Sequence, residues 1–162
     1  MLPRASQDNE LRLELPKPPK FEVCAVIRHQ GEYLCLQRRK DPRAYFSRKF
    51  EFPTAHQKCF KTPQEALTRT VEQKLGLDIQ VQAYFHTAHY QANHQPYTKD
   101  VFLCESTHRI LKRTAHLQTL WLPREALDTL DWTDADRTIL SIITSNFNPP
   151  DVLVAQNVYF HY

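Results

Sequence analysis

Thr70, Gln73 and Lys74 are spaced so that their side chains could act together. Residues three and four positions apart share one face of an α-helix. This face would offer a hydroxyl, an amide and a lysine ammonium, and an ammonium can hold phosphate oxygens through charge-assisted hydrogen bonds. Lys61 adds a second positive charge just before the segment. The spacing is compatible with a phosphate ligand, and equally with a helix kept only for packing.

The residues around this face predict a helix over residues 63–75. Thr62 can cap its start, Pro63 suits the first position, and Glu65 completes a T-x-x-E capping box. Gly76 suits the left-handed conformation that ends a helix. Four apolar residues recur at helical spacing and form the predicted buried stripe: Ala66, Leu67, Val71 and Leu75.

A second candidate for phosphate contacts is the basic run over residues 38–49. Six cationic residues face a single aspartate there: Arg38, Arg39, Lys40, Arg43, Arg48 and Lys49. Aromatic residues interleave with them, and basic groups beside aromatic rings suit phosphate and base contacts. A solvated loop explains the run equally well.

Residues 52–77 resemble a Nudix box, the loop and helix that hold metal in pyrophosphohydrolases of the MutT type. The family pattern is G-x5-E-x7-R-E-U-x-E-E-x-G-U, where U is aliphatic, and an ungapped alignment matches Arg69, Val71 and the ending Gly76-Leu77. Framework motifs outside the box agree: Q-R-R at 37–39, E-F-P at 51–53 and L-D-W-x-x-A-D at 130–136. The resemblance runs from about residue 21 to residue 147. It implies an α/β protein with the Nudix fold, a mixed β-sheet between helices (α/β/α).

The alignment puts other side chains where the family has its glutamates: Lys61, Thr70, Gln73 and Lys74. In the family these carboxylates form a hard oxygen site for Mg²⁺, which bridges phosphate oxygens and helps to activate water. Relative to that pattern the charge changes by about six units, and each like-charge contact with a cation costs on the order of a few kcal/mol. We therefore expect no metal ligands, no cofactor and no catalytic residues in this box. Thr54-Ala55 also replaces the usual Gly-Gly, which restricts the loop to negative φ.

The resemblance also implies roles for individual residues. An arginine after the glutamine contacts the phosphates in the family, and it corresponds to Arg38, with Arg39 beside it. The segment containing Trp132 and Asp136 is similar to one that lies near the nucleobase, although a helix cap at Thr133–Asp136 and a core tryptophan explain it almost as well. The predicted phosphate-binding residues are Arg38, Arg39, Lys61 and Lys74. The predicted base-binding residues are Phe52, Trp132 and Asp136.

Three functions remain open at this point. The first is a catalytically degenerate Nudix-like protein that binds a nucleotide or related phosphate ligand without hydrolysing it. The second is a weak pyrophosphohydrolase, in which water attacks a phosphoanhydride with Mg²⁺ held by unusual ligands: Glu51, Glu72 and Glu105. The third is an interaction module, including a nucleic-acid reader like the degenerate Nudix domain of the MutY type, which would bind with strong salt dependence.

Length and composition set wider limits. A chain of 162 residues with a net charge of +3 is expected to form one domain that tolerates anionic partners. We expect an N-terminal extension at 1–20, the Nudix-like domain at 21–147, and an apolar tail at 148–162 that packs on the domain or on a partner in a homodimer. There is no apolar run long enough to span a membrane, and the N-terminus lacks an apolar signal core. We therefore expect a cytoplasmic protein without membrane partners.

The remaining chain carries few chemical motifs. Cys24, Cys35, Cys59 and Cys104 are widely spaced, which favours free buried thiols over a zinc site. His86, His89 and His94 are expected as exposed histidines around a polar loop. The predicted strands cover 21–28, 33–37, 79–85 (continuing to about 88), 97–105 and 117–122. Further helices are predicted at 123–130 and from 133 onward.

Overall fold

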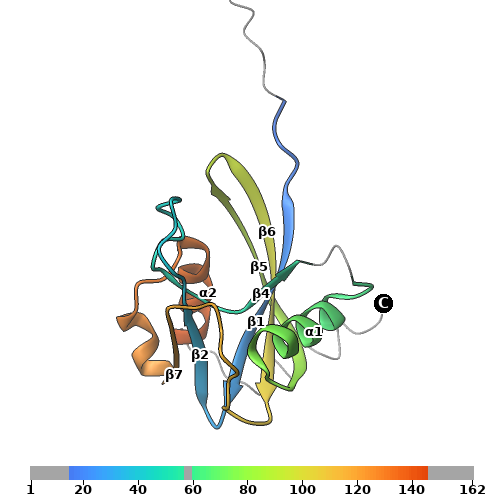
Figure 1. Ribbon diagram of the computed structural model, residues 1–162. Helices are drawn as coiled ribbons and strands as arrows, with labels where there is room; N and C mark the ends of the chain where they lie inside the picture. The colour runs from blue at the N-terminus through green and yellow to red at the C-terminus, as the bar shows by residue number, and fades with distance from the viewer. Residues whose placement is uncertain (1–14, 57–59, 146–162) are drawn as a thin grey trace, which may run out of the picture.

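The computed structural model describes residues 15–56 and 60–145. A seven-stranded mixed sheet organises this part of the chain, with helices on both faces (Figure 1). Its main path runs β3-β2-β1-β6-β5, while β4 pairs with β1 and β7 with β2. The strands are β1 (Lys20–His29), β2 (Glu32–Gln37), β3 (Phe50–Glu51), β4 (Thr54–His56), β5 (Ile79–Ala92), β6 (Gln95–Ser106) and β7 (Gln118–Pro123). The helices are α1 (Pro63–Leu75), the 3-10 helix η2 (Arg124–Thr129) and α2 (Asp134–Thr144).

Strand β1 lies at the centre of the sheet. It runs parallel to β6 and antiparallel to β2 and β4. Cys24 and Val26 belong to the core on the face covered by α2 and η2. Val23, Ala25 and Ile27 belong to the core under α1. Because successive strand residues point to opposite faces, a continuous apolar run is what a strand buried on both sides requires. The predicted α/β/α arrangement is confirmed.

Helix α1 begins and ends as the sequence predicts. The Thr62 hydroxyl accepts a hydrogen bond from Glu65 N at 3.1 Å, and Pro63 occupies the first turn. The return bond of the capping box goes to Lys61 N, which donates to Glu65 Oε2 at 3.2 Å. Gly76 adopts φ 71°, and its N–H donates to Glu72 O. Residues within and next to α1 thus determine where the helix begins and ends.

The first part of the box loop, Thr54–His56, is extended. Thr54 and Ala55 lie in β4, where they pair with Cys24 and Val23 of β1. Extended backbone has negative φ, so these positions do not require glycine. The substitution of the family's two glycines is therefore accommodated by strand pairing.

The hairpin of β5 and β6 is longer than predicted. Asn93 (φ 50°) and His94 (φ 61°) form a two-residue turn in which both residues are left-handed. His86 and His89 consequently lie within β5, so the prediction of a polar loop around the three histidines is wrong. His89 and His94 are exposed, and His86 is partly buried. Figure 1 shows this hairpin extending beyond the rest of the sheet.

Several predictions fall on residues that the structure does not describe. These are Cys59, most of the predicted extension at 1–20, and the predicted tail at 148–162. Of the described cysteines, Cys24, Cys35 and Cys104 are free and buried, as predicted. Within the described ranges, no helix has both the length and the apolar character needed to cross a membrane.

Candidate functional site

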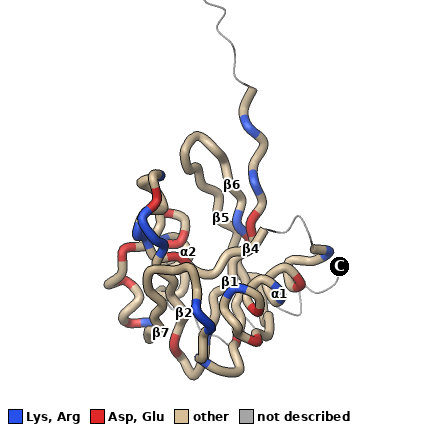
Figure 2. The backbone as a smooth tube through the Cα atoms, in the orientation of Figure 1, with Lys and Arg blue, Asp and Glu red and all other residues tan. Residues whose placement is uncertain are grey.

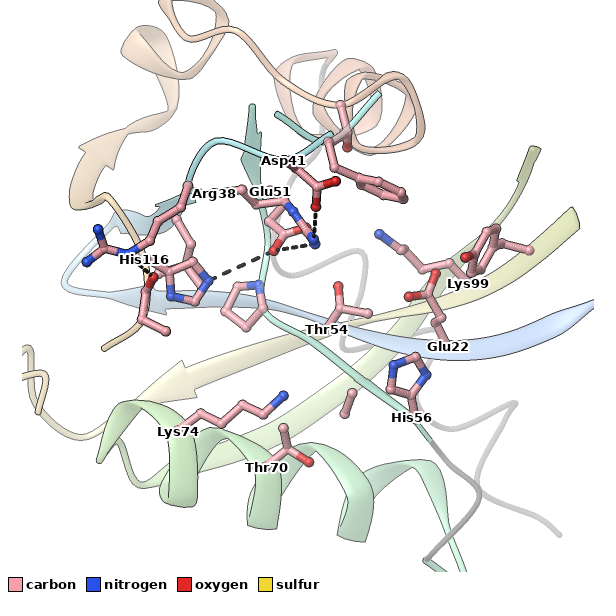
Figure 3. Close-up of a pocket in the computed structure, with 18 of the residues that line it drawn as sticks. Glu22, Arg38, Asp41, Glu51, Thr54, His56, Thr70, Lys74, Lys99 and His116 are labelled. Carbon is pink, nitrogen blue, oxygen red and sulfur yellow. Dashed lines mark hydrogen bonds and ion pairs between the residues drawn. The ribbon is translucent and has the colours of Figure 1, made fainter. Parts of the chain in front are cut away.

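A cavity of about 540 Å³ lies between α1, β4 and the loop that joins β2 to β3 (Figure 3). Helix α1 contributes Thr70 and Lys74 to its wall. The hairpin contributes Tyr90, Tyr97 and Lys99, from β5 and β6. Pockets of this size hold small organic ligands. Two of the three residues on the polar face of α1 that the sequence singles out, Thr70 and Lys74, therefore border this cavity, whereas Gln73 is exposed and does not line it.

Positive charge predominates in this cavity. Among the residues that the structure describes, seven lysines and arginines line it: Lys20, Arg38, Arg39, Lys40, Arg43, Lys74 and Lys99. Three described carboxylates line it as well: Glu22, Asp41 and Glu51. Figure 2 shows a cluster of lysines and arginines along the loop that joins β2 to β3. A cleft with excess cations attracts anions.

Of the four predicted phosphate-binding residues, the structure brings three together. Arg38, Arg39 and Lys74 all line the cavity. Lys61 does not, because it precedes α1 at the opposite end of the helix from Lys74, where its side chain is exposed. Arg69, which follows the family pattern, pairs with Glu65 at 3.3 Å.

Arg38 is held by two carboxylates (Figure 3). Its guanidinium lies 3.3 Å from Glu51 Oε2 and 3.4 Å from Asp41 Oδ2. The side chain also stacks over the Phe46 ring, with Cζ 4.6 Å from the centroid. Arg43 donates to Asp41 at 2.9 Å and holds the pKa of that carboxyl well below its usual range. These contacts orient the arginine along the cavity wall.

Glu51 connects this network to the loop after β6. Burial by itself raises the pKa of Glu51, but His116 and Arg38 outweigh it and hold the pKa below its ordinary value. His116 Nε2 lies 3.9 Å from Glu51 Oε1. The other ring nitrogen, Nδ1, is buried and has no hydrogen-bond partner among the described residues. Arg39 donates to Ala115 O at 2.7 Å, which ties the same loop to the basic run.

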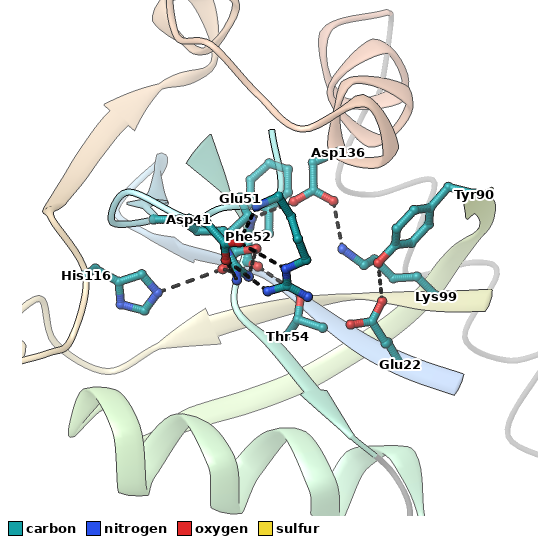
Figure 4. A network of polar contacts seen from close by, with 11 residues as sticks. Glu22, Asp41, Glu51, Phe52, Thr54, Tyr90, Lys99, His116 and Asp136 are labelled. Atoms are coloured by element: carbon teal, nitrogen blue, oxygen red, sulfur yellow. Dashed lines mark hydrogen bonds and ion pairs between the residues drawn. The ribbon is translucent and has the colours of Figure 1, made fainter. Parts of the chain in front are cut away.

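A buried ion pair fixes the other side of the cavity. Lys99 Nζ lies 3.0 Å from Asp136 Oδ1, and both side chains are at least 96% buried, with exposed fractions of 4% and 0%. Burial alone lowers the pKa of Lys99, but the Asp136 carboxylate outweighs it and raises the pKa. The second oxygen of Asp136 accepts a hydrogen bond from Phe52 N at 2.8 Å. Asp136 therefore joins α2 to β6 and to the segment before the box (Figure 4).

The three predicted base-binding residues are adjacent, but they lie in the core. Phe52 and Trp132 pack with ring centroids 4.6 Å apart, and their exposed fractions are 0% and 1%. Trp132 Nε1 donates to Leu127 O at 2.7 Å. Phe52, Trp132 and Asp136 are not among the lining residues. The capping-box interpretation of Asp136 is wrong, because its carboxylate binds Phe52 N and Lys99, and Thr133 makes no side-chain cap bond.

Sequence reasoning missed Lys99 and the tyrosines of the hairpin. The rings of Tyr45, Tyr90 and Tyr97 stack in sequence, with centroids 5.6 Å and 4.9 Å apart. Lys99 Nζ lies 5.4 Å from the Tyr90 centroid. The sequence around Lys99 gives no clear signal of its burial, because it stands between Thr98 and Asp100, before the apolar run of β6 begins at Val101.

The carboxylates proposed for an atypical hydrolase do not converge. Glu51 lines the cavity, whereas Glu72 is exposed on α1. Glu105 lies near the end of β6 and pairs with Arg28 at 2.5 Å. Within the described ranges, no three histidine, cysteine, aspartate or glutamate side chains are arranged to hold a metal ion.

Comparison with known proteins agrees with this architecture. The family model of the NUDIX domain matches residues 17–141, which is most of the chain. The chain therefore belongs to the NUDIX family. None of the curated protein sequences compared with the chain gives a significant match.

Solved structures share its fold at low sequence identity. The MutT protein from Methanosarcina mazei Go1 is similar with a TM-score of 0.70 and 20% identity, over 80% of this chain and 95% of that one. The ORF135 protein of E. coli is similar with a TM-score of 0.60 and 18% identity, over 85% and 90%. The NUDIX domain of Shewanella oneidensis NrtR, solved in complex with ADP ribose, has a TM-score of 0.59 and 12% identity, over 77% and 86%.

Proposed function

We propose that this protein binds a nucleotide or a related phosphate ligand without a divalent metal and does not hydrolyse it. The observation that carries the proposal is the position of Lys74. Its side chain leaves α1 on the wall of a cavity that Arg38 and Arg39 also line. An ammonium and two guanidinium groups around one space provide the donors that phosphate oxygens accept.

The donor set on α1 does not fit Mg²⁺. Mg²⁺ requires oxygen ligands at about 2.1 Å in near-octahedral geometry. Thr70 and Lys74 supply a neutral hydroxyl and a like charge instead. The nearby carboxylates Glu51 and Asp41 are already paired with Arg38. Helix α1 therefore does not offer the set of carboxylate ligands with which the family binds its metal.

A structural neighbour supports the ligand class. The NrtR domain was solved with ADP ribose, a nucleotide-derived diphosphate, and it shares this fold. A cavity of about 540 Å³ is large enough for a ligand of nucleotide size. The homodimer and the cytoplasmic location predicted from the sequence stay predictions. Nucleic acid also stays a prediction, with the basic run as its support.

The decisive experiment measures binding and turnover in parallel. Thermal unfolding is recorded with a panel of nucleotides and nucleotide sugars, first in EDTA and then in Mg²⁺, and each mixture is analysed for product by chromatography. A ligand at about 100 times its Kd adds about 2.7 kcal/mol, which raises the Tm by several degrees. We expect such a rise in EDTA and no product in either buffer.

Lys61 supplies the matched control. Lys74→Ala removes an ammonium from the cavity, whereas Lys61→Ala removes one from outside it. We expect only Lys74→Ala to lower the ligand-induced rise in Tm. A rise confined to Mg²⁺ would overturn metal-free binding, and product formed in Mg²⁺ would show that the protein is an enzyme. If both variants lost the ligand-induced rise in Tm equally, the ligand would be held by the general positive charge of the surface and not by the cavity.

A further inference from the structure

One end of the cavity presents a carboxylate beside a stack of aromatic rings. Glu22 lies on β1 and lines the cavity together with Tyr90 of β5. Tyr90 is the central ring of the three stacked tyrosines, and its planes lie within 8° of both neighbours. Figure 3 shows Glu22 and Lys74 entering the same cavity from different elements, β1 and α1. A ligand lying between them would meet opposite charges at its two ends.

Among the described residues, Glu22 differs from Asp41 and Glu51 in forming no ion pair, although it is near enough to Lys99 to help raise the pKa of that lysine. Asp41 and Glu51 pair with Arg38, and Asp136 pairs with Lys99. Among the described residues, the hydrogen-bond partner of Glu22 is the Tyr90 hydroxyl, and no lysine or arginine forms an ion pair with it. Burial raises the pKa of Tyr90, so this hydroxyl keeps its proton and donates.

Glu22 therefore retains acceptor capacity that faces the cavity. A carboxylate offers about four lone-pair positions, and the Tyr90 hydroxyl uses one of them. An ionised carboxylate cannot donate, so it favours groups that carry N–H or O–H and repels carbonyl oxygens. Tyr45 and Tyr97 cover the two faces of the Tyr90 ring, so an aromatic ligand ring would pack against its edge or against an outer face of the stack. The carboxylate and the aromatic rings at this end of the cavity thus both favour a flat ring that carries N–H donors.

We propose that Glu22 determines which ligand the cavity accepts, by receiving hydrogen bonds from the N–H groups of a heterocyclic ring. The ligand is then a phosphate ester whose ring presents amino or imino donors at the Glu22 end and whose phosphate lies at the Lys74 end. This inference rests on the proposed function, because it describes the second half of the same ligand. It assigns to Glu22 the recognition role that the sequence suggested for Asp136.

The proposal ranks ligands by the donors on their rings. Guanine presents a ring N–H next to an amino group, so both can donate to one carboxylate. Uracil presents one N–H between two carbonyl oxygens, which a carboxylate repels. Ribose 5-phosphate has no ring base and reports on the phosphate end alone. These three compounds separate recognition of the base from recognition of the phosphate.

The test measures the Kd by calorimetry, in EDTA, for guanosine monophosphate, uridine monophosphate and ribose 5-phosphate. A charge-assisted hydrogen bond changes affinity by about 10- to 100-fold. We expect the wild-type protein to bind the guanosine compound at least about tenfold more tightly than the uridine compound. Glu22→Gln keeps an acceptor for Tyr90 and should remove most of that preference, leaving the affinity for ribose 5-phosphate unchanged. Glu72→Gln, on the exposed side of α1, is the control and should change neither.

The outcomes separate the two proposals. Equal affinity for both nucleotides in the wild-type protein, or a preference that survives in Glu22→Gln, would overturn the role of Glu22 while phosphate binding stands. Absence of binding by all three compounds would overturn the proposed function and this inference with it. Circular dichroism of Glu22→Gln verifies folding, and equal affinities in the wild-type protein would overturn the role of Glu22 even if the variant does not fold.

Discussion

The Asp136 carboxylate accepts a hydrogen bond from the backbone N–H of Phe52 at 2.8 Å, although the two residues are 84 positions apart in the chain. The same carboxylate pairs with Lys99, so one side chain connects α2, β6 and the segment that leads into β4. Neighbouring backbone bonds reinforce the connection, because Phe50 N donates to Asp131 O and Thr133 N donates to Phe50 O. The start of α2 thus fixes the backbone on which Glu51 is mounted.

The first prediction concerns the stability that Asp136 provides. Asp136→Ala leaves the Lys99 ammonium buried without a partner, and breaking such a pair costs about 3–5 kcal/mol. Urea denaturation of the variant should show a loss of that size. Adding Lys99→Met should recover part of it, because the unpaired charge is gone.

Asp134→Ala is the control for this measurement. Asp134 lies in the same first turn of α2, with a side chain that is 83% exposed. Its removal should change the free energy of unfolding by less than about 0.5 kcal/mol. If Asp136→Ala lowered the free energy of unfolding no more than Asp134→Ala does, the contacts of Asp136 with Lys99 and Phe52 would not contribute to stability.

The second prediction concerns metal binding by α1. A Thr70→Glu, Gln73→Glu, Lys74→Glu variant places three carboxylates on one helical face and removes the like charge. We expect it to gain a rise in Tm with millimolar Mg²⁺ that the wild-type protein lacks, of several degrees if the metal reaches about 100 times its Kd.

A variant with amides at the same positions gives a matched comparison. Thr70→Gln with Lys74→Gln leaves Gln73 in place and presents three amides of nearly the same shape. It should show no response to Mg²⁺, because neutral amides are much weaker ligands than carboxylates for this ion. A response of the wild-type protein equal to that of the carboxylate variant would contradict the idea that Lys74 excludes the metal.

The parts of the fold that the sequence predicts well depend on neighbouring residues. Thr62, Pro63, Glu65 and Gly76 define α1 through contacts within a few positions, and each does so in the structure. The family framework supplied the sheet, because no periodicity in β1 reveals that it pairs in parallel with β6. Neighbouring residues in the sequence thus predict single helices and strands, whereas the arrangement of these elements was predicted from the family resemblance.

The residues that the sequence misassigned depend on contacts between distant segments. Asp136 stands three positions after Thr133, which is the spacing of a capping box, yet a partner on β6 and a backbone N–H in the box loop determine its role. The loop between β5 and β6 was predicted too long, because Asn93-His94 lacks the glycine that usually marks a turn with two left-handed residues. Neither the contacts of Asp136 nor the position of the turn can be read from a pattern in the nearby sequence.

The third prediction concerns the buried thiols. Burial raises the pKa of the Cys35 thiol to about 12 and also raises the pKa of Cys24 and Cys104. Because the thiolate is the reactive form, these three cysteines should resist iodoacetamide at pH 8 in the native protein. Peptide mass spectrometry should find them unmodified after an hour and fully modified in urea. Rapid native labelling of any of the three would mean that the core opens locally.

The last prediction concerns the stability of the protein in acid. The pKa of Glu51 in the folded protein lies below its ordinary value of 4.5, so the folded state holds the ionised form more strongly than the unfolded chain does. A carboxyl of this kind stabilises the fold above its ordinary pKa, and the stabilisation is lost as the pH falls through the folded pKa. Replacing it with glutamine should therefore weaken the dependence of unfolding free energy on pH between about pH 5 and pH 3.

Urea denaturation at several pH values measures that slope for the wild-type protein, for Glu51→Gln and for Glu72→Gln. Because Glu72 is exposed and lies outside the cavity, its variant should keep the wild-type slope. An unchanged slope in Glu51→Gln would show that Arg38 and His116 do not hold the carboxylate in its ionised form.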